Sequence, residues 1–204
     1  PLHAMGTLLL ELRKPLAAIA AFRRCLAIDP DHVAALEGFA TAQRRAGRAG
    51  NFEELLAARL RVAALRPDSV DAQYRVANAY RSFELFTDAA QWYDKVLAMD
   101  PGDLTARWAR FQHPDAIINT DAAAERAFLA RWREGLAHFE HIDVDDKRTR
   151  GHFGPVLTNA TSFYLHYLGE AFVDEQRRYA RVVERMARAL LPELCAYQPP
   201  ASAA

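Results

Sequence analysis

Histidine and carboxylate side chains gather near residue 140, and together these residue types can bind a transition metal. His138 and His141 are three positions apart, and Asp143, Asp145 and Asp146 follow closely. This cluster lies where an expected helix runs into a polar segment, so most of its side chains should face solvent. We therefore expect no metal site here.

Other reactive groups are few. The two cysteines, Cys25 and Cys195, lie far apart in the sequence. We expect Cys25 to fill a small buried position and Cys195 to be exposed near the end of the chain. The sequence has no serine elbow, no phosphate-binding glycine loop and no HExxH motif. It thus predicts no catalytic residue and no cofactor.

The charge balance excludes one large class of partner. The 204 residues contain 26 Lys+Arg and 26 Asp+Glu, giving a formal net charge of zero. General nucleic-acid binding needs an excess of cations to neutralise phosphates, so we expect no nucleic-acid partner. No apolar run approaches the ~18 residues of a membrane helix, and no signal peptide is visible. We expect a cytoplasmic protein with no membrane partner.

A repeat organises the first half. Three segments end alike, in Pro30, Pro67 and Pro101, and each proline follows a short apolar stretch. A period near 34 residues closed by proline resembles the tetratricopeptide repeat (TPR), a helix-turn-helix unit. Small residues recur at its helix crossings, where two backbones must approach closely; they are Gly6, Ala18, Ala77 and Ala89.

The second repeat departs from this pattern. The segment 44–50 adds residues to its turn, Leu55 replaces the usual small residue, and Arg59 replaces the usual aromatic residue. We therefore expect a longer turn and a looser helix pair. Arginines 44, 45, 48, 59, 61 and 66 form a local basic stretch, which we expect to be a solvated face.

After Pro101 the repeat gives way to other helical patterns. We expect an incomplete fourth repeat over 104–112, which stops at His113-Pro114 because the residue before proline disfavours helix. The further expectations are helices over 119–140, 162–168 (ending at Gly169) and 173–191, with a long loop over 141–155. The fold class is thus all-α: a TPR α-solenoid of about three repeats (1–103), a helical cap or linker over its open end (104–197), and a flexible tail (198–204).

The second half also resembles a more specific family. The segments 108–114, 117–118, 125–136, 159–170 and 176–180 are similar to the linker of bacterial TPR-linked glycosyltransferases, of the O-linked N-acetylglucosamine transferase and SPINDLY group. In that family a TPR array leads through a helical linker into a two-lobed transferase domain. The resemblance implies that this chain is a non-catalytic N-terminal part, with the transferase activity in a domain in cis. The family's asparagine ladder is absent, because its positions hold Ala4, Gly38 and Arg75.

The repeat phase predicts a ligand groove on the first helix of each repeat. Asparagine can bind a peptide backbone, arginine a carboxylate, and aromatic rings a side chain. The expected groove residues are Glu37, Thr41, Arg44, Tyr74, Asn78, Arg81, Trp108 and Gln112. Glu37 and Tyr74 argue against the two-carboxylate clamp of chaperone-binding TPRs. The alternative to a ligand groove is a solvent-exposed surface that binds nothing, with Trp108 buried under the second half.

These patterns leave four functional hypotheses, one of which is a small enzyme within the second half. The preferred one is a scaffold that binds a protein or peptide and presents it to a glycosyltransferase. The alternative is a free-standing TPR adaptor with no enzymatic activity in cis. A remote one is a J-domain-like co-chaperone, suggested only by His113-Pro114-Asp115, and there a simple helix stop is the better interpretation.

Overall fold

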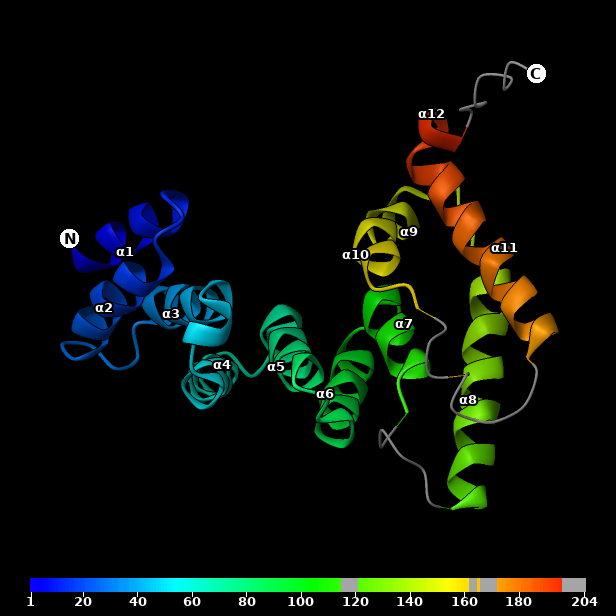
Figure 1. The fold of residues 1–204 in the computed structure, drawn as a ribbon, viewed down its shortest axis with the longest axis horizontal. Coiled ribbons are helices and arrows are strands. Elements are labelled where there is room, and N and C mark those ends of the chain that lie inside the picture. The colour runs from blue at the N-terminus through cyan, green and yellow to red at the C-terminus, as the bar shows by residue number, and fades with distance from the viewer. Residues whose placement is uncertain (115–120, 162–164, 166–171, 196–204) are drawn as a thin grey trace, which may run out of the picture. The chain divides into compact units, whose positions relative to one another are not determined.

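Helices form all the regular structure of the described residues in the computed structural model (Figure 1). The structure describes residues 1–114, 121–161, 165 and 172–195. The chain divides into two compact units, Pro1–Met99 and Asp100–Ala204. The all-α expectation is confirmed, and each unit is described below by itself.

The first unit consists of three consecutive helix pairs. Its elements are α1 (Leu2–Glu11), α2 (Pro15–Leu26), α3 (Val33–Arg45), the short 3₁₀ helix η1 (Gly47–Ala49), α4 (Phe52–Leu65), α5 (Val70–Ser82) and α6 (Phe86–Met99). Several of these helices start at residues that favour a helix N-terminus. Pro15 occupies the first turn of α2. At the starts of α3, α4 and α5, a capping side chain accepts a backbone N–H group; the caps are His32, Asn51 and Ser69.

Glycines allow the first three helices to pack closely. Phe22 on α2 is fully buried, and Gly6 and Gly38 approach its ring from α1 and α3. A Cβ atom on Gly6 would lie 2.6 Å from the ring, and one on Gly38 would also overlap it. The small residue of the repeat pattern is therefore a steric requirement here, because the ring has no room to move.

The second helix pair has the longer turn that was expected, but it is not loose. Gln43 on α3 accepts the Asn51 backbone N–H at 2.8 Å and donates to Glu54 on α4. Leu55 and Arg59 are both buried on α4. The side-chain amide of Gln43 thus closes the inserted turn and keeps the two helices together.

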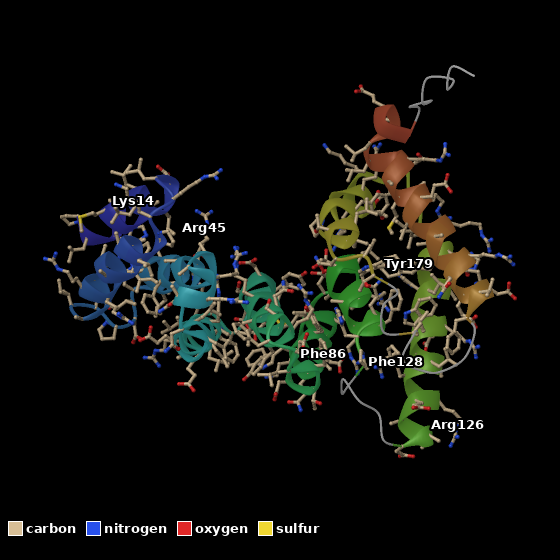
Figure 2. All side chains as sticks on the ribbon, viewed as in Figure 1. Lys14, Arg45, Phe86, Arg126, Phe128 and Tyr179 are labelled. Atoms are coloured by element: carbon tan, nitrogen blue, oxygen red, sulfur yellow. The ribbon has the colours of Figure 1, made fainter. Side chains whose placement is uncertain are left out.

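The second unit is built around aromatic side chains. Its elements are α7 (Leu104–Gln112), α8 (Ala122–Glu140), α9 (Lys147–Gly151), α10 (Phe153–Thr158), α11 (Val173–Leu190) and α12 (Pro192–Cys195). Asp121 caps α8, and His113 ends α7 in extended backbone. Trp108, Phe111, Trp132 and Phe139 meet in one buried cluster, together with Tyr179 of α11. Figure 2 labels Tyr179 and Phe128, two members of this cluster.

The expected loop over 141–155 is wrong in its second part, which contains α9 and the start of α10. Asp146 accepts the Thr149 N–H at 2.8 Å and caps α9, while Phe153 and Val156 bury α10 in the core. These short helices depend on tertiary packing more than on local propensity. The expected helix 162–168 lies outside the described residues except for Leu165, which is buried, and the expected tail 198–204 lies wholly outside them.

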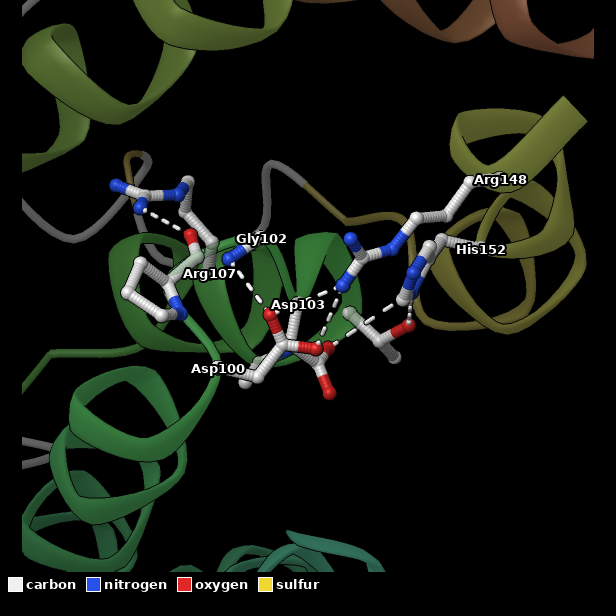
Figure 3. A network of polar contacts seen from close by, with 9 residues as sticks. Asp100, Gly102, Asp103, Arg107, Arg148 and His152 are labelled. Atoms are coloured by element: carbon white, nitrogen blue, oxygen red, sulfur yellow. Dashed lines mark hydrogen bonds and ion pairs between the residues drawn. The ribbon is translucent and has the colours of Figure 1, made fainter. Parts of the chain in front are cut away.

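Polar contacts tie α9 and α10 to the start of α7 (Figure 3). Arg148 pairs with Asp100 at 3.1 Å, and His152 Nδ1 lies 3.0 Å from Thr105 Oγ1 and 3.8 Å from Asp103. Asp103 also caps α7 by accepting the Ala106 N–H. This network is explained by helix capping and packing within the second unit.

None of the described helices is long and apolar enough to cross a lipid bilayer.

Candidate functional site

A cavity of about 380 Å³ opens in the first unit between α3, α4 and α5. We call it the α3–α5 cavity. Ala40 and Arg44 of α3 line it, with Leu55 and Arg59 of α4. The rest of the lining comes from α5 and the residue after it: Asp71, Tyr74, Arg75, Asn78, Ala79, Arg81, Ser82 and Phe83. First helices of two consecutive repeats thus face one hollow.

Four of the predicted groove residues meet in this cavity: Arg44, Tyr74, Asn78 and Arg81. Asn78 Oδ1 accepts from Tyr93 Oη at 2.9 Å and from Arg81 Nε at 3.2 Å. These bonds fix the orientation of the amide, and its nitrogen takes part in neither of them. Asn78 can therefore donate to a ligand carbonyl without losing its contacts within the unit.

Glu37 and Thr41 belong to the same helix as Arg44 but do not line the cavity. Thr41 donates to the Glu37 carbonyl at 2.8 Å and accepts from Arg59 Nη2 at 3.3 Å. Glu37 forms an exposed ion pair with Arg66 at 3.7 Å. Thr41 thus contacts Arg59, and the groove roles predicted for Glu37 and Thr41 stay predictions.

Trp108 and Gln112 do not lie on an open groove, so this part of the expected site is corrected. Each is only 1% exposed, inside the core of the second unit. Trp108 packs edge-on against Phe139, and Gln112 Nε2 donates to Tyr179 Oη at 2.9 Å. The inner face of α7 is covered by aromatic side chains of α8 and α11, which leaves no surface for a ligand there.

Sequence reasoning did not include Arg59, Arg75, Asp71 or Phe83 in the site. Arg59 carried a signal, because it stands where the equivalent positions hold Phe22 and Tyr93. Asp71 and Arg75 pair on the surface of α5 at 2.5 Å. Phe83 follows the end of α5 and packs against Phe52, with the two rings tilted and their centroids 3.8 Å apart. Nothing in its local pattern marks it as a lining residue.

The basic stretch 44–66 is not one solvated face. Arg59 is buried, whereas Arg61 pairs with Asp31 at 2.6 Å and Arg66 with Glu37. Arg45 donates to the Leu10 carbonyl at 3.1 Å. These arginines serve different contacts, and only Arg44 and Arg59 of the stretch line the cavity.

The other candidate sites offer fewer side chains that could bind or react with a ligand. Within the ranges described, no three His, Cys, Asp or Glu side chains come together closely enough to hold a metal. Cys25 is buried in the core of the first unit, whereas the Cys195 side chain lies outside what the structure describes. A second hollow of about 410 Å³ is lined by Lys14, Pro15, Leu16, Ala17, Arg45, Ala46 and Ala49. Figure 2 labels Lys14 and Arg45. This hollow offers few polar groups to orient a ligand.

The geometry of the first unit defines a class of protein: a helical-repeat solenoid whose first helices line a ligand-sized cavity. The tetratricopeptide-repeat family model matches residues 3–61 and 49–103. Residues 3–103 are therefore built of tetratricopeptide repeats. No curated protein sequence matches the chain significantly.

Solved TPR structures share the fold at low sequence identity. A crystal structure of MamA has a TM-score of 0.59 and 12% identity, and the match covers 94% of this chain and 97% of that one. MamA from Desulfovibrio magneticus RS-1 has a TM-score of 0.53 and 18% identity, with 70% and 76% covered. YrrB, described as a TPR protein with an unusual peptide-binding site, has a TM-score of 0.55 and 13% identity, with 95% and 86% covered.

Proposed function

We propose that this protein is an interaction scaffold that holds a peptide segment of a partner protein in the α3–α5 cavity. One observation carries the proposal: Arg44, Tyr74, Asn78 and Arg81, placed on α3 and α5, line a single cavity. All four were expected to face a ligand from the repeat phase alone. The TPR family and the peptide-binding site named for YrrB are consistent with this use of the fold.

The lining suits an extended peptide chemically. Asn78 can donate its amide N–H to a backbone carbonyl, and arginines can pair with carboxylates. Tyr74 and Phe83 offer aromatic surface to an apolar side chain. A concave site with a few placed polar groups on a rigid helical frame is the usual form of a small binding site.

A double substitution tests the proposal. Asn78→Ala with Arg81→Ala should weaken partner capture in a pull-down by roughly tenfold or more, because each removes a polar contact worth about 1 kcal/mol or more. The matched control is Asp88→Ala with Gln91→Ala, two exposed residues of α6 outside the cavity. Circular dichroism would verify that both variants are folded. Unchanged capture by the first variant would contradict the proposed site.

The link to a glycosyltransferase remains a further proposal. It is supported by the resemblance of the second half to the linker of those enzymes. The tetratricopeptide-repeat match ends at residue 103 and does not include that half. A coding sequence that continues past Ala204 into alternating strands and helices would support it. A stop codon there would favour the free-standing adaptor. The role of residues 104–197 as a cap on the repeats likewise stays a prediction.

A further inference from the structure

Arg59 is an arginine in a position that the other repeats fill with a buried ring. The equivalent residues, Phe22 and Tyr93, are 0% and 2% exposed, and Arg59 is 6% exposed. Tyr93 bonds its hydroxyl to Asn78 on the first helix of its repeat, and Arg59 likewise bonds Nη2 to Thr41 on α3. The arginine therefore keeps the contact pattern of the ring but adds a charge to the interior.

That charge is only partly satisfied. Arg59 Nη1 is buried and has no hydrogen-bond acceptor among the residues that the structure describes. Burying a cation without an acceptor is costly, so such groups are normally paired. Arg59 also lines the α3–α5 cavity, so an anion held in the cavity lies beside its side chain.

The cavity around Arg59 is strongly cationic. Arg44, Arg75 and Arg81 line it as well, and Asp71 is the only acidic residue of the lining. Asp71 is already paired with Arg75. The pKa of Arg59 is lowered to about 10, first by burial and then by repulsion from Arg75, with Arg44 adding to it and Glu37 and Asp71 opposing it. The cavity therefore has a positive potential that its own carboxylate does not cancel.

We propose that Arg59, with Arg44 beside it, binds an anionic side chain of the peptide held in the α3–α5 cavity. This inference rests on the proposed function and specifies the chemistry of its ligand. The anion is a carboxylate or a phosphate, because a guanidinium presents two parallel N–H donors that match either oxyanion. The Arg59 side chain is already buried and bonded to Thr41 at 3.3 Å, so little side-chain entropy is lost when the anion binds.

Peptide selection on the full chain tests this inference. Random displayed peptides would be enriched on the immobilised protein, and the best one synthesised in three forms: as selected, with its acidic residue replaced by Gln, and with that residue replaced by phosphoserine. Fluorescence anisotropy then gives each affinity. We expect one enriched Asp or Glu position and an affinity roughly tenfold lower for the Gln form, as a charge-assisted hydrogen bond is lost. Tighter binding of the phosphoserine form would identify phosphate as the preferred anion.

Arg59→Tyr separates the charge from the fold. Tyrosine is the residue of the equivalent position in the next repeat, and its hydroxyl can take Thr41 as a partner, so the variant should stay folded. It should bind the acidic peptide roughly tenfold more weakly and the Gln peptide about equally. The matched control is Arg61→Gln, which removes one positive charge from an exposed residue of the same helix outside the cavity. It should leave both affinities unchanged.

The outcomes distinguish the two proposals. If the selected peptides bind but tolerate Gln at every acidic position, or bind Arg59→Tyr as tightly as the natural protein, the anion site is wrong and the peptide scaffold stands. If no peptide is enriched at all, the scaffold function is overturned and the anion site with it. An acidic preference that is lost with Arg59→Tyr and kept with Arg61→Gln supports both.

Discussion

Two buried polar residues, Gln112 and Arg59, differ in how many of their hydrogen-bonding groups have a partner. In the second unit, Gln112 donates to Tyr179 Oη and accepts the Thr161 N–H, so its amide is used on both sides. Burial raises the pKa of Tyr179 above its usual value, opposed by the Gln112 hydrogen bond, and the phenol therefore stays neutral. In the first unit, Arg59 keeps an unused donor beside a cavity. A buried polar group whose donors and acceptors are all bonded fixes the local packing. A buried donor without an acceptor is destabilising unless a further group bonds to it.

The ion pair between Glu140 and Arg178 should make the second unit sensitive to acid. Arg178 donates two hydrogen bonds to Glu140, at 2.8 and 2.7 Å. They lower the pKa of Glu140, burial opposes this, and the charge of Arg178 adds to it. Because the folded pKa lies below the unfolded one, the pair stabilises the fold above the unfolded pKa. That contribution disappears as the pH falls through the folded pKa.

Glu140→Gln should therefore reduce the free energy of unfolding by up to about 1 kcal/mol at neutral pH, since the pair is partly exposed. At a pH below the folded pKa of Glu140 the variant and the natural protein should be equally stable. Urea denaturation followed by circular dichroism at a series of pH values measures this. A stability difference that persists unchanged into strong acid would contradict the assigned role of the carboxylate.

At the scale of elements, local sequence rules predicted the positions of most helices. They did not predict which helix faces are covered by other helices. The repeat spacing and the His113-Pro114 stop gave α7 its observed bounds, because capping and periodicity are local properties. The same spacing predicted that Trp108 and Gln112 lie on an open face of α7, and both are buried. Whether that face is open depends on α8 and α11, which are distant in sequence. The groove predicted on α3 and α5 therefore stays a prediction, supported by the shared cavity, and the groove predicted on α7 is wrong.

The site residues follow the same division. The presence of Arg44, Tyr74, Asn78 and Arg81 in the cavity lining was predictable because the repeat phase fixes the direction of a first helix. The presence of Arg59 there was not predicted, although its departure from the pattern was visible. A second-helix position points into the interior, and only the three-dimensional structure shows that a cavity reaches it.

Gly135 on α8 provides a packing test for the contact between α7 and α8. A Cβ atom there would overlap Phe111 Cβ and Cγ, which lie close to the α7 backbone and cannot turn away. Gly135→Ala should therefore lower the free energy of unfolding by about 1–3 kcal/mol, despite the better helix propensity of alanine. Gly151→Ala is the matched control, because nothing lies within 4 Å of its added methyl. Thermal denaturation compares the two, and equal midpoints would show that α7 can shift freely.

At the scale of the whole molecule, the division at Met99 separates the candidate site from the aromatic core. Every residue that lines the α3–α5 cavity belongs to Pro1–Met99, and so does the whole core cluster around Phe22. The second unit has its own core, which extends from Leu104 to Met186. The proposed peptide binding and the packing of the second unit therefore depend on different sets of residues.

A fragment of residues 1–99 should consequently fold and bind by itself. Three stacked helix pairs reach the number of repeats that a solenoid needs to bury a continuous core. We expect a cooperative unfolding transition with a free energy of at least about 5 kcal/mol, typical of a small domain. Its affinity for a selected acidic peptide should equal that of the full chain. Circular dichroism and fluorescence anisotropy measure the two properties. A folded fragment that has lost its affinity would show that residues beyond Met99 complete the site, because folding and cavity lining would then no longer account for binding.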